Sequence, residues 1–113
     1  MVRSYVPKAG DIVWLEFDPQ AGREQAGRRP AVVLTPEVYN KKTNLMICCP
    51  LTSQIKGYPF EVLVELDGVE SVILSDQVKS LDWKTRKAKY KNKVSSSVLA
   101  EVRAKAKSLL SIA

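Results

Sequence analysis

The chain has 113 residues, of which 45% are hydrophobic and 27% are charged, and its formal net charge is +6. These proportions exclude a disordered chain and are typical of a globular protein, so we expect one domain over residues 1–113. Because the sequence shows neither a run of about 20 apolar residues nor the apolar core of a signal peptide near its start, we expect a cytoplasmic protein with no membrane partner.

Short runs rich in β-branched and aromatic residues predict a series of strands. The predicted strands span residues 11–17, 31–35, 45–50, 60–66 and 71–78. Turn residues separate them, such as Asp18-Pro19 and Gly22 after the first strand, and we predict no helices between them. Five or six strands at this spacing favour a small antiparallel barrel over βαβ units.

The end of the chain has a different pattern. From Val98 onward, apolar residues recur at helical spacing, namely Leu99, Val102, Ala106, Leu109 and Leu110. The serines at 95–97 are candidate N-caps, and Glu101 lies in the first turn. The pattern predicts one amphipathic helix that packs on the barrel.

The segment from Asp18 to Pro30 is predicted to be a loop of 13 residues, at the upper edge of ordinary connections. Its two glycines, Gly22 and Gly27, have the spacing of a phosphate-binding loop, but a strand follows where that motif needs Lys-Ser/Thr and a helix. Pro30 biases Arg29 toward an extended conformation at the start of a strand, a geometry suited to binding a phosphate bidentately. A solvated surface turn fits the composition equally well.

Two further pairs of residues lie near the end of the third predicted strand. Thr52 and Ser53 carry hydroxyls that could donate to a phosphate oxygen, although a turn capped by its own side chains explains them as well. Cys48 and Cys49 are adjacent, so they point to opposite faces of a strand and are expected to be reduced and structural. The chain has no histidine, and we predict no metal site and no cofactor.

The excess positive charge comes from the segment Lys84 to Lys93, which holds six basic residues and no acidic one. Subtracting these six from the 18 basic residues leaves 12, which equals the number of acidic residues. The lysines at 87, 89, 91 and 93 alternate, so in an extended segment they would share one face and lack neutralising partners. This pattern favours a nucleic-acid partner, and the alternative is an edge strand protected by lysines against aggregation.

At this point the chain resembles the MazF/PemK-type toxins of bacterial toxin–antitoxin systems, and it is most similar to the MazF branch. The resemblance rests on "YVPKAGDIVWLEFDPQAGREQAGRRPAVVLTP", "YNKKT", "TSQIKGYPFEV" and "DQVKSLDW". It implies a mainly β fold with C-terminal helix, a small SH3-like antiparallel barrel of the CcdB/PemK type. It also implies a homodimer and a cognate acidic antitoxin, MazE-like, that lies in the groove used by RNA.

The activity that this resemblance implies is a sequence-specific, metal-independent endoribonuclease that inhibits translation and growth. Its substrate would be single-stranded mRNA, cleaved at short sites such as ACA to leave a 2′,3′-cyclic phosphate and a 5′-hydroxyl. The family's catalytic arginine and threonine match Arg29 and Thr52, and its loop glutamate matches Glu24. The candidate RNA-binding residues are Arg28, Ser53, Lys56, Asp76, Gln77, Lys79, Arg86, Lys87, Lys89 and Lys91.

Two positions depart from the family pattern. Arg28 stands where well-known members carry histidine, so a proton-transfer role at that position is absent. The PemK branch has an arginine two residues before its catalytic aspartate, whereas this chain has Leu74 before Asp76, so we do not assign Asp76 the leading catalytic role.

The chemistry of the residues agrees with this assignment. Cleavage through a cyclic phosphate uses the RNA 2′-hydroxyl as nucleophile and needs a base, an acid and donors for the developing charge. Because the chain has no histidine, the carboxylate of Glu24 is the candidate base. Arg29 is the candidate charge stabiliser, and Thr52 is a second hydrogen-bond donor. We assign no residue as the acid, because an arginine side chain holds its proton too tightly to give it to the 5′-oxygen. Two alternatives are a non-catalytic RNA-binding barrel and a gyrase-poisoning toxin of the CcdB type, although that group relies on a C-terminal tryptophan and this chain ends in "SLLSIA".

Overall fold

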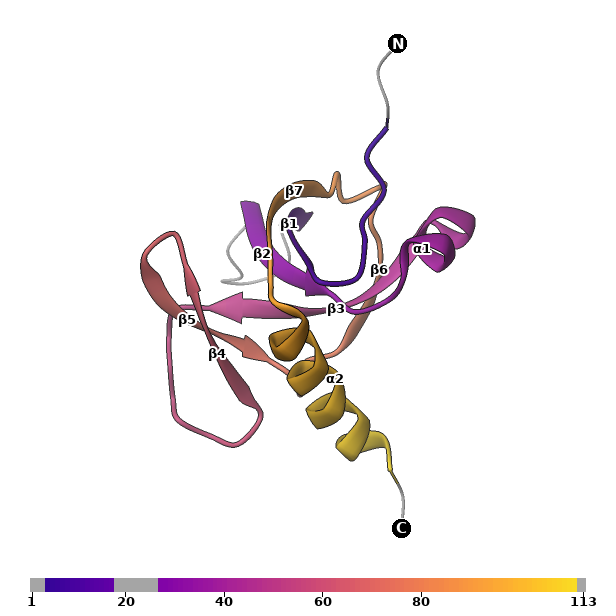
Figure 1. Ribbon diagram of the computed structural model, residues 1–113. Helices are drawn as coiled ribbons and strands as arrows, with labels where there is room; N and C mark the ends of the chain where they lie inside the picture. Colours follow the sequence, from indigo (N-terminus) through magenta and orange to yellow (C-terminus); the bar gives the residue numbers. More distant parts are fainter. Residues whose placement is uncertain (1–3, 18–26, 112–113) are drawn as a thin grey trace.

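A computed structural model describes residues 4–17 and 27–111 of the chain (Figure 1). In order, the elements are β1 (Asp11–Phe17), β2 (Gly27–Val33), α1 (Glu37–Thr43), β3 (Leu45–Thr52), β4 (Glu61–Leu66), β5 (Val69–Leu74), β6 (Lys79–Asp82), β7 (Lys89–Lys93) and α2 (Ser96–Leu110). All strand pairs are antiparallel, in the order β4-β5-β3-β2-β1-β7, with β6 paired to β3. The predicted mainly β barrel with a C-terminal helix is confirmed. Neither described helix is long and apolar enough to cross a membrane.

The curled sheet separates two hydrophobic cores because side chains alternate along each strand. On β1, Ile12 enters the core that α2 covers with Val102, whereas Val13 and Leu15 enter the core that Trp83 closes. β3 crosses the centre of the molecule (Figure 1) and has apolar side chains in both cores. This double burial explains why β3 reads as a continuous apolar run in the sequence.

β3 changes partners along its length, and this bends the sheet. Its first half pairs with β6, its middle pairs with β2, and its last two residues, Leu51 and Thr52, pair with β5. The start of β2, the ends of β3 and β5 and the start of β6 lie together in one region of the molecule. That region contains the candidate site described below.

Helix α2 begins after a predicted N-cap, with the hydroxyl of Ser95 accepting a hydrogen bond from the backbone N–H of Val98 (3.2 Å). Contrary to prediction, Glu101 lies beyond the first turn, and Leu109 and Leu110 of the predicted packing face are exposed. The basic side chains of the helix reach back to the sheet. The guanidinium of Arg103 donates from Nε to the carbonyl of Leu34 (3.2 Å), and Lys105 Nζ donates to the carbonyl of Pro59 (2.6 Å). The helix is thereby joined both to the barrel and to the loop between β3 and β4.

The structure corrects four details of the predicted elements. A short helix, α1, interrupts the strands, and the strands number seven within the described residues. β2 begins at Gly27, so residues 27–30 lie within a strand and not in the predicted 18–30 loop. β5 ends at Leu74, and residues 75–78 connect it to β6 rather than extending the strand.

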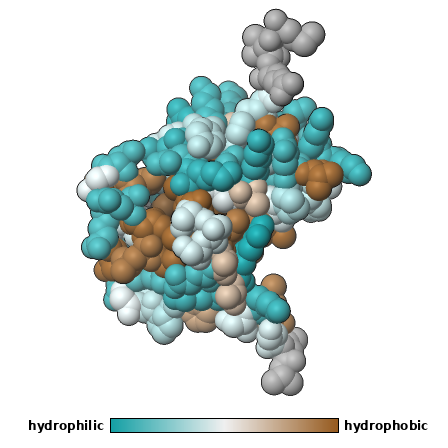
Figure 2. All heavy atoms as spheres, in the orientation of Figure 1, coloured by the Kyte–Doolittle hydropathy of each residue, from teal (hydrophilic) through white to brown (hydrophobic). Residues whose placement is uncertain are grey.

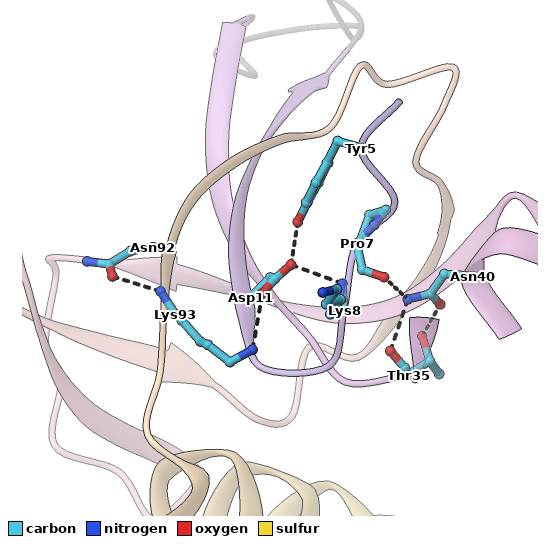
Figure 3. Close-up of polar contacts among 8 residues, drawn as sticks. All are labelled: Tyr5, Pro7, Lys8, Asp11, Thr35, Asn40, Asn92 and Lys93. Atoms are coloured by element: carbon cyan, nitrogen blue, oxygen red, sulfur yellow. Dashed lines mark hydrogen bonds and ion pairs between the residues drawn. The ribbon is translucent and has the colours of Figure 1, made fainter. Parts of the chain in front are cut away.

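Buried polar side chains hold the N-terminal segment and α1 against the sheet (Figure 3). The amide of Asn40, which is fully buried, donates to the carbonyls of Pro7 (2.9 Å) and Thr35 (3.0 Å) and accepts from the Thr35 hydroxyl (2.6 Å). Asp11 accepts from the Tyr5 hydroxyl (2.5 Å), and burial together with this bond raises the pKa of Tyr5. Asn40 pairs with segments far away in the sequence, which is why α1 could not be predicted from local patterns.

Candidate functional site

A cleft of about 380 Å³ opens where the start of β2 and the ends of β3 and β5 meet the β3–β4 loop. The lining residues are Arg29, Pro50, Leu51, Thr52, Gln54, Lys56, Tyr58, Glu61, Leu74, Gln77 and Lys79. The volume is near the lower end of the range for ligand pockets, about 300–1,000 Å³. A pocket of this size fits a small group such as one nucleotide better than a length of folded nucleic acid.

Arg29 and Thr52 both line the cleft. The pairing of β2 with β3 ends at Ala31 and Pro50, and Thr52 pairs instead with β5, so the two side chains reach the cleft from different strands. Arg28 lies on the other face of β2, where its guanidinium carbon is 5.7 Å from the centroid of the Trp14 ring. The structure therefore directs Arg29 into the cleft and Arg28 away from it.

The Thr52 hydroxyl is oriented for donation. Its Oγ1 accepts a hydrogen bond from the backbone N–H of Gln54 at 3.1 Å. A hydroxyl carries one proton and two lone pairs, so accepting this bond leaves the proton available for another group. Thr52 is only half-buried, and its side chain can meet a ligand in the cleft.

The carboxylate of Glu61 organises the loop that forms one wall of the cleft. Its Oε1 accepts from the backbone N–H of Gly57 (2.7 Å), and its Oε2 accepts from that of Lys56 (2.9 Å). Gly57 has a φ of 84°, a left-handed conformation that glycine adopts without strain. This turn carries the Lys56 side chain to the cleft.

The cleft is basic. Among the residues that the structure describes, its lining contains three cationic side chains, Arg29, Lys56 and Lys79, and one carboxylate, that of Glu61, whose two oxygens already accept backbone N–H groups. An excess of positive charge in a concave site attracts anionic ligands such as phosphate groups. The arrangement can bind a phosphate and stabilise further negative charge developing on it.

Tyr58 and Asp76 meet at the edge of the cleft. The Tyr58 hydroxyl donates to Asp76 Oδ1 at 2.8 Å, and this hydrogen bond raises the pKa of Tyr58. Gln77 and Lys79, which were predicted to bind RNA, follow Asp76 and line the cleft themselves. The sequence interpretation missed Tyr58 and Glu61, although an aromatic residue directly after Gly57 in "KGYPFE" was a signal for an exposed platform.

Other predicted residues lie outside the cleft. Ser53 is exposed next to Thr52 without lining it, and Glu24 falls outside the described residues. Arg86 and Lys87 belong to the connection between β6 and β7, and Lys89 belongs to β7. The structure therefore divides the predicted RNA-binding residues between the cleft and a separate basic segment.

The basic segment differs from its prediction in two respects. Lys87 has a φ of 53° and lies in a turn before β7, so the alternating lysines do not form one continuous extended face. The expectation that they lack neutralising partners is also wrong. Lys91 pairs with Asp67 and lies 5.1 Å from the centroid of the Trp14 ring, and Lys87 and Lys93 pair with acidic residues of β1.

The two cysteines are free and buried, as predicted. Burial raises the pKa of Cys48 to about 11 and that of Cys49 to about 12, so both thiols stay protonated at neutral pH. Among residues 4–17 and 27–111, no group of three or more His, Cys, Asp or Glu side chains is arranged to hold a metal ion.

Comparison with known proteins places the chain among toxins. Residues 8–110 match the family described as PemK-like, MazF-like toxin of type II toxin–antitoxin system. The endoribonuclease toxin MazF of Escherichia coli K12 is 50% identical over 105 residues, covering 93% of this chain and 95% of that protein. Endoribonuclease PemK of Escherichia coli is 34% identical over 102 residues, covering 82% and 74%. A MazE–MazF crystal structure from Deinococcus radiodurans is 54% identical, with a TM-score of 0.88 and coverage of 97% and 100%.

Proposed function

The chain belongs to the family of PemK-like, MazF-like toxins of type II toxin–antitoxin systems, and from this premise we propose a sequence-specific, metal-independent cleavage of single-stranded mRNA. The enzyme is an endoribonuclease, like the relatives named above. We place its active site at the cleft. The observation that carries the proposal is that Arg29 and Thr52 both line a basic cleft sized for one nucleotide.

In the proposed reaction, the RNA supplies its own nucleophile. The 2′-oxygen forms a bond to phosphorus while the bond from phosphorus to the 5′-oxygen breaks, leaving a 2′,3′-cyclic phosphate and a 5′-hydroxyl. The 2′-hydroxyl proton passes to a base, and the departing 5′-oxygen gains a proton. No metal is needed, because side chains can stabilise the charge that develops on the nonbridging oxygens.

Arg29 is the proposed charge stabiliser, since a guanidinium can donate two parallel hydrogen bonds to phosphate oxygens. Thr52 donates a third bond with the proton that its contact to Gln54 leaves available. The cationic side chains of Lys56 and Lys79, on the same cleft, neutralise neighbouring phosphates. Glu24 stays our proposed base on the grounds of the family resemblance and the absence of histidine.

We further propose that an acidic, MazE-like antitoxin competes with RNA for the basic cleft. The toxin would act in the cytoplasm as a homodimer. Its cleavage of mRNA at ACA-like sites would stop translation and growth. The solved Deinococcus radiodurans relatives include MazE–MazF complexes. Figure 2 shows apolar side chains gathered over β4 and β5, and Leu63 and Val69 of this hairpin are more than half exposed. Exposed apolar patches of this kind are typical of protein interfaces.

The proposal is tested by incubating the protein with a defined RNA in excess EDTA and mapping both ends of the fragments. We expect cleavage at a few sites, with cyclic phosphate and 5′-hydroxyl ends, and cleavage by Arg29→Ala that is slower on the order of 10²–10³-fold. Loss of cleavage in EDTA with recovery on adding Mg²⁺ would contradict the metal-free mechanism. Equal cleavage by a folded Arg29→Ala protein would move the active site away from this cleft.

A further inference from the structure

The Tyr58 side chain is held in place at the cleft although it lies on a loop. Its hydroxyl is bound to Asp76, and its carbonyl accepts from the backbone N–H of Glu61 (3.1 Å). On either side, the N–H of Gly57 donates to the Glu61 carboxylate, and the carbonyl of Pro59 accepts from Lys105 of α2. These contacts fix the ring as a wall of the cleft before any ligand binds.

Asp76 is fixed in a similar way. It lies in the connection from β5 to β6, where Ser75 donates from its backbone N–H to the carbonyl of Phe60 (3.0 Å) and Gln77 donates to that of Leu74 (3.1 Å). The Tyr58 hydroxyl engages Asp76 Oδ1, and an ionised carboxylate has further acceptor capacity on both oxygens. Asp76 is exposed, so this capacity faces solvent or a ligand.

Stability alone gives little reason for this arrangement. Water competes for an exposed hydrogen bond, whose net contribution to the free energy of unfolding is small. An aromatic ring and an acceptor held together at a basic cleft are, however, the two elements that single-stranded RNA recognition uses. Bases stack on aromatic side chains, and their edges are read by hydrogen bonds.

We propose that Tyr58 and Asp76 form a base-reading pair that selects a base with an exocyclic amino group beside the phosphate held by Arg29. The Tyr58 ring stacks on the base, and the Asp76 carboxylate accepts a hydrogen bond from the amino group. Adenine, cytosine and guanine carry such a donor, whereas uracil places carbonyl oxygens on either side of its single N–H and is repelled by a carboxylate. The location of that phosphate rests on the proposed function.

Binding to an RNA that cannot be cleaved tests the pair independently of catalysis. The probes are fluorescent seven-nucleotide oligomers with 2′-O-methyl groups throughout, each carrying A, C, G or U in turn at every position, with affinity measured by anisotropy. For the wild type we expect one position at which uracil binds at least tenfold more weakly than an amino-bearing base. Asp76→Asn should bind uracil there nearly as well as adenine, because an amide can both donate and accept.

Tyr58→Phe keeps the ring and loses the bond to Asp76, so we expect weaker discrimination with affinity largely retained. Tyr58→Leu removes the stacking surface and should weaken binding about 5- to 150-fold, whichever base is present. Tyr90→Phe and Glu70→Gln are the matched controls, since they make the same chemical changes at exposed residues that do not line the cleft. Thermal unfolding of every variant checks that the fold is intact.

The outcomes separate this inference from the proposed function. A wild type that binds all four bases equally at every position, or an Asp76→Asn variant that still rejects uracil, overturns the base-reading pair. Cleavage of the matching unmodified RNA by the same proteins reports on the proposed function. Discrimination between bases in binding, without cleavage, would support the base-reading pair and contradict the proposed chemistry. Cleavage without discrimination between bases would support the proposed chemistry and contradict the base-reading pair.

Discussion

Replacing Thr52 by valine should separate catalysis from stability. Valine keeps the shape of threonine and removes the hydroxyl that accepts from Gln54 and that we expect to donate to the phosphate. A hydrogen bond to a charged group contributes about 1.5–3 kcal/mol, so kcat/KM should fall about 10- to 150-fold. Because the Gln54 N–H is exposed and can be hydrated, the free energy of unfolding should fall by less than about 1 kcal/mol.

The assay compares initial cleavage rates of one fluorogenic RNA at subsaturating concentration with urea unfolding of the same preparations. Thr52→Ser is the matched control, since it keeps the hydroxyl and loses only a methyl group, and it should keep most of the activity. Near wild-type cleavage by Thr52→Val would remove the hydroxyl from the mechanism. Equal losses in the valine and serine variants would show that packing by the methyl group, and not hydrogen bonding, is what matters at this position.

Arg29→Ala should lower the cleavage rate on the order of 10²–10³-fold, and Arg29→Lys should restore little because the bidentate fork is lost; single-turnover kinetics measure both. Asn40→Ala should lower the free energy of unfolding by about 2–5 kcal/mol, because the carbonyls of Pro7 and Thr35 lose their donor and the Thr35 hydroxyl loses its acceptor. A loss below about 1 kcal/mol, measured by urea unfolding, would contradict this. Stability should also fall as the pH rises from 9 toward 11, because the buried thiols of Cys48 and Cys49 keep their protons when those of the unfolded chain, with an ordinary pKa of 9.0, have lost them. A flat stability profile over this range would show that the thiols do not stay protonated in the folded state.

Local patterns were sufficient for the elements that bury an alternating or helical face. β1 spans residues 11–17 as predicted, and α2 begins directly after its N-cap. In both elements, the spacing of apolar residues along the sequence indicates which face is buried. β2 was predicted to start at Ala31, since residues 28–30 show no apolar pattern. Pairing with β1, in which Trp14 lies opposite Pro30, extends the strand to Gly27 despite the sequence.

In the candidate site, too, some residues could be predicted from the sequence and others depend on contacts between distant segments. Arg29 and Thr52 could be named from the resemblance to known toxins, and both line the cleft. Tyr58 could not, because its significance depends on a partner 18 residues away in another loop. The partners that hold side chains at the cleft are distant in sequence, and no periodic pattern records which distant residues will meet.

The sequence and the structure predict different salt dependences of RNA binding for a variant that lacks three lysines. Replacing Lys87, Lys89 and Lys91 by serine should flatten the slope of log K against log salt by roughly 2 if each lysine contacts one RNA phosphate, at about 0.7 per contact. In the structure, however, Lys87 is 3.9 Å from Glu16, and Lys91 pairs with Asp67 with only 12% of its side chain exposed. A lysine already paired with a carboxylate neutralises an RNA phosphate less completely, so fewer counterions leave the RNA when it binds.

The structure therefore predicts a smaller change for the triple substitution, about 0.7, with Lys89→Ser alone giving most of it. RNA affinity measured at several salt concentrations for the single and triple variants distinguishes the cases. A flattening close to 2 would mean that RNA displaces Glu16 and Asp67 from their lysines, so that the ion pairs are exchanged on binding. An unchanged slope, with increased aggregation of the triple variant, would leave protection of the β7 edge as the role of this segment.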